Sequence, residues 1–240
     1  PEVLAKFNPN NGIQTKLGRI ALVSDAAHSI GASYNQLKTG NHADMSSFSF
    51  HAVKNLTTAE GGAVAFNLPE PFDNQETKQL FKTLSLHGQS KDALSKNKAG
   101  GWEYDVTYAG YKCNMTDIQA AIGLVELNRY QETLNKRKII FELYDKCLKD
   151  KPWAITPTYQ SANKISSYHL YMLRIKGCSL DQRNEIINQM SNKGIAVNVH
   201  YKPLPLLTFY KNLNYKIDEF PQSYKNYENE ISLPVFYNLS

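Results

Sequence analysis

The chain has 240 residues, of which 42% are hydrophobic, and a formal charge of +5 from 27 basic and 22 acidic side chains. This composition allows a substantial core, in one large domain or two small ones. The basic residues form no long run and no apolar stretch would cross a membrane, so we expect neither nucleic-acid nor membrane partners. The three cysteines lack paired or metal-like spacing, which favours a reducing, cytoplasmic compartment and no metal site.

The first 115 residues predict a mixture of strands and helices. The expected elements are a polar loop or short helix end at 1–17, strands at 20–24, 46–50 and 63–66, a helix at 73–86, and a long surface loop at 90–108. Residues 20–23 form a continuous apolar run, which is typical of a buried parallel strand. The helix prediction depends on Leu80, Phe81 and Leu84, which recur at helical spacing.

The remaining residues predict a long helix and then a smaller α/β unit. Thr116 and Gln119 have the spacing of a capping box, and Pro152 ends the helix. Its later part is expected to bury one apolar face, made of Ile140, Leu143, Tyr144, Cys147 and Leu148. Further elements are expected as a strand at 169–175, a helix at 180–193 with Gly194 as its C-cap, and a strand at 195–200.

Lys54 follows a half-buried strand pattern, in which Phe48, Phe50 and Ala52 occupy alternate positions. Such a strand would hold the lysine at the edge of a packed core. Burial there disfavours the charged ammonium and frees the lone pair for attack on a carbonyl. With Ser49 five residues earlier and paired glycines beyond, the pattern suits a lysine that forms a Schiff base with an aldehyde cofactor. Taken alone, however, such a lysine is more often a surface residue at a strand end.

Asp25 makes the pattern more specific. It follows the apolar run 20–23 at its carboxyl end, where ligands bind in open α/β sheets. A carboxylate there can keep a pyridinium nitrogen protonated, which pyridoxal phosphate needs in order to act as an electron sink. The alternative is a helix N-cap, a common role for Asp after a strand. Asp25 and Lys54 together point to a pyridoxal-phosphate site much more strongly than either residue does alone.

Several segments in order along the chain carry a family resemblance. They are 24–32, 48–62, 86–88, 110–123, 168–171, 194–195, 200–201 and 232–234. In these segments the chain resembles the DegT/DnrJ/StrS family of pyridoxal-phosphate sugar aminotransferases, over nearly its whole length. The segment 110–117 is most similar to enzymes that aminate UDP-4-keto sugars, such as UDP-4-amino-4-deoxy-arabinose aminotransferase.

The resemblance implies an α/β fold of the aspartate-aminotransferase-like class (fold type I). It divides the chain into the remainder of the large cofactor-binding domain (1–115), a long linking helix (116–151) and a small C-terminal α/β domain (152–240). It also implies transfer of an amino group from an amino acid, usually glutamate in this family, to a nucleotide-linked keto-sugar, with a role in the bacterial envelope. The family's N-terminal stretch has no counterpart here, so we expect this chain to be the middle and C-terminal part of a longer enzyme.

The resemblance also assigns roles to cofactor-binding residues. Lys54 would hold pyridoxal phosphate as a Schiff base and then act as general base, and Asp25 would stabilise the pyridinium. His28 would lie against the cofactor ring, and Ser49 would bind the phosphate. A core histidine and an ordinary strand-face serine are the alternatives for these two. Lys112 departs from the Asn that is common in the family; it could bind the phosphate of the neighbouring subunit in a homodimer with a shared active site, or be an exposed loop lysine.

Substrate residues are implied by matches further along the chain. His200 and Tyr201 match a segment near the sugar nucleotide, His169 matches another recurring histidine, and Trp102 lies in a loop that matches a mobile active-site flap. Packing or structural roles are the alternatives for all four.

Three functions fit a chain of this kind. A sugar aminotransferase needs both Asp25 and Lys54. A related dehydratase uses a histidine in place of the lysine, so the presence of Lys54 argues against it. A regulator that keeps the fold would be expected to lose Asp25 or Lys54, and both remain. A catalytically incomplete fragment stays open as an alternative, because the family's N-terminal stretch carries cofactor contacts.

Overall fold

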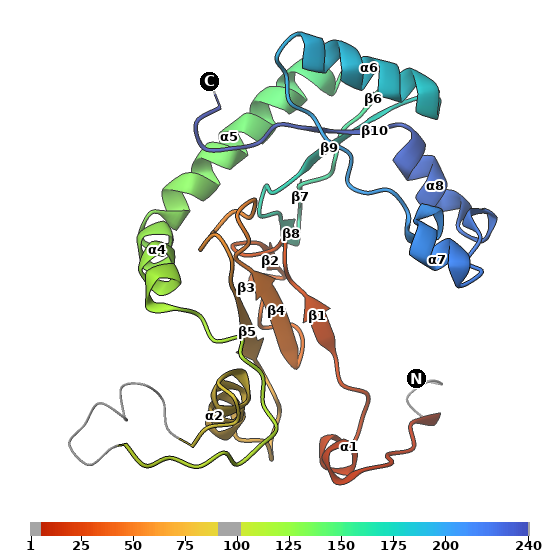
Figure 1. Cartoon of the computed structure of the whole chain (residues 1–240). Coiled ribbons are helices and arrows are strands. Elements are labelled where there is room, and N and C mark those ends of the chain that lie inside the picture. The colour runs from red at the N-terminus through yellow and green to blue at the C-terminus, as the bar shows by residue number, and fades with distance from the viewer. Residues whose placement is uncertain (1–5, 91–101, 240) are drawn as a thin grey trace. The chain divides into compact units, whose positions relative to one another are not determined.

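The computed structural model describes residues 6–90 and 102–239. The chain divides into two compact units, Pro1–Arg129 and Tyr130–Ser240 (Figure 1). Among the described residues, no helix combines the length and the apolar character that crossing a membrane requires.

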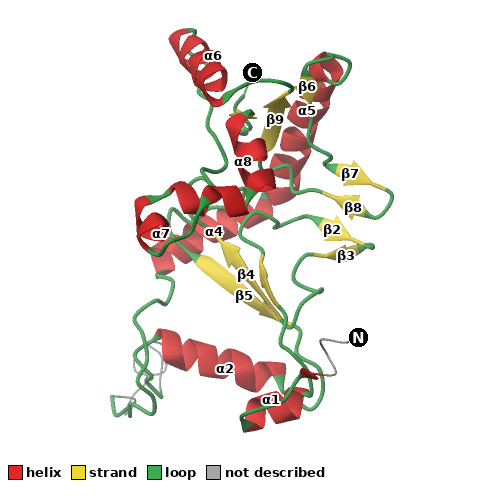
Figure 2. Ribbon diagram, turned by 90° about the vertical axis from the view of Figure 1, so that its right-hand side faces the viewer, coloured by secondary structure: helices red, strands yellow, loops and turns green. Residues whose placement is uncertain are grey.

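The first unit is built on a three-stranded sheet. Strand β1 (Val23–Asp25) pairs in parallel with β4 (Met45–Ser49), and β5 (Gly62–Phe66) pairs with β4 in the antiparallel direction, in the order β1-β4-β5. Figures 1 and 2 both show β4 and β5 side by side. The strands expected at 46–50 and 63–66 are confirmed to within one residue.

The strand expected at 20–24 is shorter and more exposed than predicted. Only its last part, Val23–Asp25, forms β1. The side chains of Leu22 and Val23 are 56% and 65% exposed, although the apolar run predicted a buried strand. The physical reason is position: β1 is an edge strand of the three-stranded sheet in the described part of the chain, and a strand is buried on both faces only when layers cover the sheet on each side.

Helix α2 (Asn74–Ser85) packs against this sheet and confirms the helix expected at 73–86. Asp73 is its N-cap and accepts from the backbone N–H groups of Gln75 and Glu76. The rings of Phe66 on β5 and Phe81 on α2 meet edge-on with centroids 4.8 Å apart. The unit also contains α1 (Gly12–Leu17), which begins after the N-cap Asn11, and the hairpin of β2 (Ser33–Tyr34) and β3 (Leu37–Lys38).

The single helix expected from 116 to 151 is instead two helices, α4 (Asp117–Asn128) and α5 (Tyr130–Leu148). The capping box of Thr116 and Gln119 is present at the start of α4, as predicted. Arg129 separates the two helices with φ −101° and ψ 5°. Neither Gly nor Pro occurs at this point, so no common helix breaker signals the interruption in the local sequence.

The buried face of α5 differs from the predicted one. Its buried residues are Thr133, Leu134, Arg137, Ile140 and Phe141. Leu143 is 55% exposed and Cys147 is also exposed, whereas Tyr144 and Leu148 pack at the edge of the core. The expected face was therefore wrong for Leu143 and Cys147. Helical periodicity alone does not show which of two neighbouring apolar stripes faces the core.

The second unit has an antiparallel sheet in the order β10-β9-β6, formed by Glu230–Leu233, Tyr171–Ile175 and Ala154–Ile155. Its core gathers Leu134, Phe141, Tyr168, Tyr171 and Leu173. Helix α6 (Leu180–Asn192) confirms the predicted helix, and Gly194 follows its end with a left-handed φ of 78°. The remaining elements are β7 (Gln160–Ser161), β8 (Lys164–Ile165), α7 (Thr208–Asn212), α8 (Pro221–Glu228), and the short 3-10 helices η2 (Leu204–Leu206) and η3 (Ile217–Glu219).

Two strands predicted in the second unit differ from those observed. The strand expected at 169–175 is present as β9, which starts two residues later at Tyr171. The strand expected at 195–200 was wrong, because this segment makes only one isolated bridge, between Asn198 and Ser232. The apolar residues 195–197 suit a strand, but pairing continues for a single position beside β10.

Candidate active site

The carboxyl ends of the two parallel strands, β1 and β4, lie together at one end of the first unit's sheet. Asp25 is the last residue of β1 and pairs in register with Ser47 on β4, which ends two residues later at Ser49. The backbone N–H of Ala26 donates to the carbonyl oxygen of Ser47 at 2.8 Å and extends this pairing by one residue. Asp25 and Ser49 therefore lie at the same carboxyl end of the sheet, which is where open α/β sheets bind ligands.

Asp25 ends a strand and begins a turn. Its Oδ1 atom accepts a hydrogen bond from the backbone N–H of Ala27 at 3.1 Å, as in an Asx turn. Residues 26–31 form turns and no helix. The helix N-cap that sequence left open as an alternative is therefore not the role of Asp25.

Lys54 lies in a turn after β4 and not at the end of a longer strand. β4 stops at Ser49, and the predicted alternation is not seen: Phe48, Ser49 and Phe50 are all half-buried, and Ala52 is exposed. The turn is closed by backbone hydrogen bonds from Lys54 N to the carbonyl of His51 (2.9 Å) and from residue 58 N to that of Phe50 (2.9 Å). The two residues after the lysine are buried, and they anchor the turn to the unit.

The side chains of Lys54 and His28 meet. Lys54 Nζ lies 2.6 Å from His28 Nε2, across 26 residues of sequence. Both side chains are half-buried. Burial lowers the pKa of His28, the charge of Lys54 lowers it further, and the carboxylate of Asp25 acts in the opposite direction. Asp25 and Lys54 are therefore both close enough to His28 to influence its pKa.

In this arrangement the neutral imidazole of His28 can accept a hydrogen bond from the ammonium of Lys54. The lysine is thereby aimed back towards the turn that follows β1. An amine, an imidazole and a carboxylate at the open edge of a sheet can together bind and move a proton beside an electron-poor ring.

Ser49 and the glycine pair shape the same end of the sheet. The hydroxyl oxygen of Ser49 accepts from the backbone N–H of His51 at 3.3 Å. Gly62 pairs with Ser49 in the β4–β5 ladder, and a Cβ atom at this glycine would lie 2.7 Å from the carbonyl oxygen of Phe48. Only glycine allows this close approach of the two strands. Whether Ser49 binds a phosphate stays a prediction.

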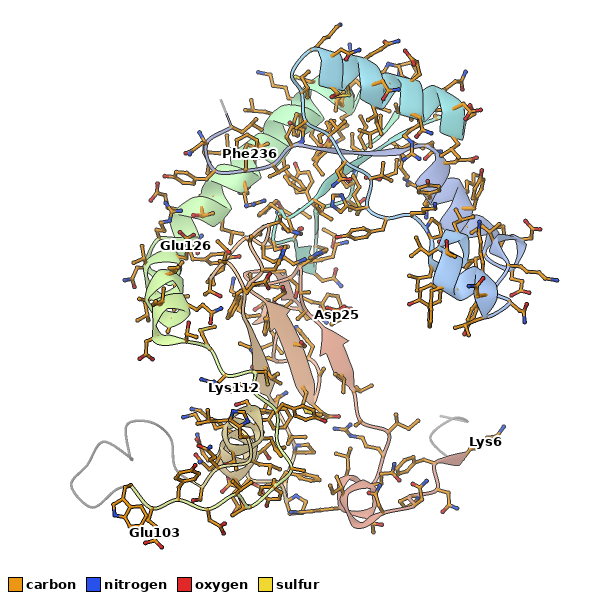
Figure 3. The ribbon with its side chains drawn as sticks, in the orientation of Figure 1. Lys6, Asp25, Glu103, Lys112, Glu126 and Phe236 are labelled. Atoms are coloured by element: carbon orange, nitrogen blue, oxygen red, sulfur yellow. The ribbon has the colours of Figure 1, made fainter. Side chains whose placement is uncertain are left out.

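Lys112 lies elsewhere in the first unit. Its ammonium pairs with the side-chain oxygen of Asn114, and its backbone bridges to Leu86 after α2. Figure 3 shows Lys112 on the segment beyond α2, apart from Asp25 at the end of β1. The side chain is exposed. Its role towards the phosphate of a neighbouring subunit stays a prediction.

The predicted substrate residues have varied surroundings. Trp102 is 77% exposed, and the neighbouring part of its predicted loop, 91–101, lies outside the described residues. His169 precedes β9, and its carbonyl oxygen accepts from the buried Arg137 at 3.4 Å. His200 and Tyr201 line a cavity of 510 Å³ in the second unit. The substrate role of these four residues stays a prediction.

Sequence reasoning missed one group beside His200. Glu230 on β10 is 4% exposed and accepts from the backbone N–H of His200 at 2.9 Å. Ser232 connects the two side chains, with its oxygen 2.7 Å from His200 Nδ1. The alternation of residues 230 and 232 along a strand is the signal that could have placed both on one face. Among the described residues, no cluster of His, Cys, Asp and Glu side chains is suited to hold a metal ion.

Comparison with known proteins assigns the family. The sequence profile of the DegT/DnrJ/EryC1/StrS aminotransferase family matches residues 13–240. Spr1654 from Streptococcus pneumoniae, solved in PMP and PLP forms, superposes in its PMP form with a TM-score of 0.93 and 46% identity, over 100% of this chain and 60% of that one. The expected aspartate-aminotransferase-like fold is confirmed by this match.

Two curated relatives are similar to this chain over most of its length. MJ1066 from Methanocaldococcus jannaschii is 39% identical over 90% of this chain and 55% of its own length. The UDP-4-amino-4,6-dideoxy-N-acetyl-beta-L-altrosamine transaminase from Campylobacter jejuni serotype O:2 is 36% identical over 92% of this chain and 54% of its own length. The chain thus spans little more than half the length of these relatives. It belongs to the DegT/DnrJ/EryC1/StrS aminotransferase family.

Proposed function

We propose that the protein is a pyridoxal-phosphate-dependent aminotransferase that moves an amino group from an amino acid to a nucleotide-linked keto-sugar. The observation that carries this proposal is the 2.6 Å contact of Lys54 Nζ with His28 Nε2, with Asp25 close enough to influence the histidine. These are the residue types that a fold type I enzyme needs around its cofactor: an amine, a ring neighbour and a carboxylate.

The residues fit this cofactor on chemical grounds. A bound pyridoxal phosphate would supply an electron sink for the carbanion that forms when an amino acid loses its α-proton. Asp25, at the open end of β1, offers a carboxylate to a protonated ring nitrogen. Lys54 offers a primary amine that can bind the aldehyde carbon and later carry a proton. Ser49, at the end of β4, offers a hydroxyl to the phosphate.

His28 has two tasks in this proposal. Its Nε2 atom orients the lysine amine, because the two nitrogen atoms are within hydrogen-bond distance. Its lowered pKa keeps the ring neutral over a wider pH range, so that it accepts from Lys54 and adds no second positive charge. A neutral ring is also the form that can lie against an aromatic cofactor without repelling its pyridinium.

The proposed acceptor substrate is a UDP-linked sugar with a keto group at carbon 4, and the proposed donor is glutamate. The Campylobacter relative is named for a 4-amino UDP-sugar, and the segment 110–117 resembles enzymes that aminate UDP-4-keto sugars. The net charge of +5 suits an anionic nucleotide. The active protein is proposed to be a homodimer, with Lys112 serving the neighbouring subunit's cofactor phosphate.

The dehydratase and regulator alternatives gain no support from the site. A dehydratase of this fold would carry a histidine at position 54, and a regulator would have no reason to keep both the lysine and Asp25 beside His28. The relatives that carry a functional name agree with amino transfer.

The direct test is a half-reaction. The purified protein is mixed with pyridoxal phosphate and its absorbance is recorded before and after addition of glutamate. We expect the bound cofactor to convert to pyridoxamine phosphate, and a UDP-4-keto sugar to reverse the change. Lys54→Ala should abolish the conversion, and Lys82→Ala, an exposed lysine on α2, should leave it intact. Undiminished turnover by Lys54→Ala would overturn the proposal.

A further inference from the structure

A buried carboxylate lies beside His200 in the second unit. Strand β10 pairs with β9 on one side and, through the bridge of Asn198 with Ser232, with the segment 195–200 on the other. The two backbone hydrogen bonds of that bridge, 2.7 and 3.2 Å long, set an antiparallel register. In this register His200 lies opposite Glu230. Residues 230 and 232 share one face of the strand because side chains alternate.

This register places three polar side chains in contact. Glu230 accepts from the backbone N–H of His200 through Oε2 at 2.9 Å and from the hydroxyl of Ser232 through Oε1. The oxygen of Ser232 lies 2.7 Å from His200 Nδ1. Glu230 and Ser232 are each only 4% exposed, so their contacts are largely shielded from solvent, which strengthens hydrogen bonds.

The donor and acceptor capacities of these groups decide the direction of the hydrogen bonds that join His200, Ser232 and Glu230. An ionised carboxylate only accepts hydrogen bonds, and the hydroxyl of Ser232 has a single hydrogen. If that hydrogen is given to Glu230, the serine oxygen can only accept at His200 Nδ1. Burial raises the pKa of Glu230, while Ser232, the backbone N–H of His200 and the positive charge of Arg183 all favour the ionised form.

We propose that Glu230 and Ser232 are positioning residues that hold His200 in the Nδ1–H tautomer, which leaves the lone pair of the ring on Nε2. A neutral histidine otherwise has two tautomers, and the hydrogen bond at one nitrogen selects the state of the other. In this arrangement His200 Nδ1–H donates to the oxygen of Ser232, and the hydroxyl of Ser232 donates to the carboxylate of Glu230.

The consequence for binding concerns the cavity of 510 Å³ that His200 lines together with Thr158, Arg174, Tyr201, Tyr227 and Glu230. In this tautomer His200 Nε2 is an acceptor and not a donor towards any group that it contacts. The matching ligand groups are hydroxyl and N–H donors, which a sugar carries in quantity. This consequence depends on the proposed function, whereas the tautomer itself does not.

The proposal is tested by determining the tautomer of His200, using long-range proton–nitrogen NMR on the whole chain with ¹⁵N-labelled histidine. A His200→Asn spectrum identifies the signals of His200. At a pH where the ring is neutral, we expect Nδ1 at the shift of a protonated nitrogen and Nε2 at that of an unprotonated one. The opposite assignment in the unsubstituted protein would overturn the proposal.

Glu230→Gln gives a sharper test because this substitution should reverse the tautomer of His200. The amide oxygen of the glutamine would accept from the backbone N–H of His200, which can only donate. The amide nitrogen would then donate to the oxygen of Ser232. The serine would then donate to Nδ1, and the protonated-type shift should move to Nε2. Retention of the original tautomer in this variant would contradict the proposal that Glu230 and Ser232 select the tautomer of His200. If Glu230→Gln fails to fold, Ser232→Ala decides, since it should produce a mixture of tautomers, and an unchanged single tautomer refutes the proposal.

Kinetics supply a second readout. In the loaded enzyme, Ser232→Ala should raise the KM for the keto-sugar on the order of tenfold, the value of one hydrogen bond, with a much smaller change in kcat. A fall in kcat at constant KM would contradict positioning of a binding group. If the protein aminates no sugar at all, the proposed function fails while the NMR result still stands on its own.

Discussion

Phe141 should contribute strongly to the stability of the second unit's core. Its side chain is 1% exposed, and its ring meets those of Tyr159, Tyr168 and Tyr171 edge-on, at centroid distances of 5.3, 5.4 and 5.1 Å. Truncation of a buried Phe to Ala costs about 3–5 kcal/mol. Favourable ring pairs add about 0.5–1.5 kcal/mol each beyond the area they bury, so we expect Phe141→Ala to fall near the top of that range.

The assay is urea denaturation followed by far-UV circular dichroism, with Leu143→Ala as the matched control. Leu143 lies on the same helix and is 55% exposed, so its truncation should change the free energy of unfolding by only about 0.5 kcal/mol. Phe141→Leu keeps most of the volume but loses the ring contacts, and should cost about 1–2 kcal/mol. If Phe141→Ala and Leu143→Ala agreed within about 1 kcal/mol, the assignment of the core face would be refuted.

Two further predictions concern charges in the first unit. Arg19 holds the pKa of Asp44 below its ordinary value through hydrogen bonds of 2.6 and 2.7 Å, so Asp44→Asn should be less stable than the unsubstituted protein at neutral pH. The deficit should shrink as pH falls below about 4, where the carboxylate takes up its proton; a constant difference in unfolding midpoints across the acid range would contradict this. In the cofactor-free protein, Lys54→Met should raise the pKa of His28 and Asp25→Asn should lower it further, as followed by NMR titration; shifts of the opposite sign would exclude the arrangement.

Local patterns predicted those parts of the fold that short-range physics decides. The capping box of Thr116 and Gln119, the N-terminal boundary of α2 and the glycine after α6 depend on hydrogen bonds within a few residues, and all are present. The strands β4 and β5 were also predicted, because a short apolar pattern is visible in the local sequence.

Features that depend on distant partners were not predicted. The exposure of Val23 follows from the edge position of β1, and that position is a property of the sheet. The segment 195–200 has strand-forming residues but pairs at one position only. The break at Arg129 has no Gly or Pro to announce it. In each case tertiary context overrides a local propensity.

The candidate site shows the same division. Spacing and residue type singled out Asp25 and Lys54, because a carboxylate after a strand and a lysine after the next strand are sequence-local features. The contact between His28 and Lys54 spans 26 residues and was not predicted, because the family resemblance placed His28 only beside the cofactor ring. Glu230 was missed because its importance arises only from the register that brings it opposite His200.

The measurement that tests the central claim most directly is the site of covalent cofactor attachment. The protein is incubated with pyridoxal phosphate, reduced with borohydride, digested and analysed by mass spectrometry. The account predicts that the reduced cofactor is found on the peptide that contains Lys54 and that Lys54→Ala removes it, while Lys82→Ala does not. Attachment at another lysine, or none at all in a folded protein, would contradict the account.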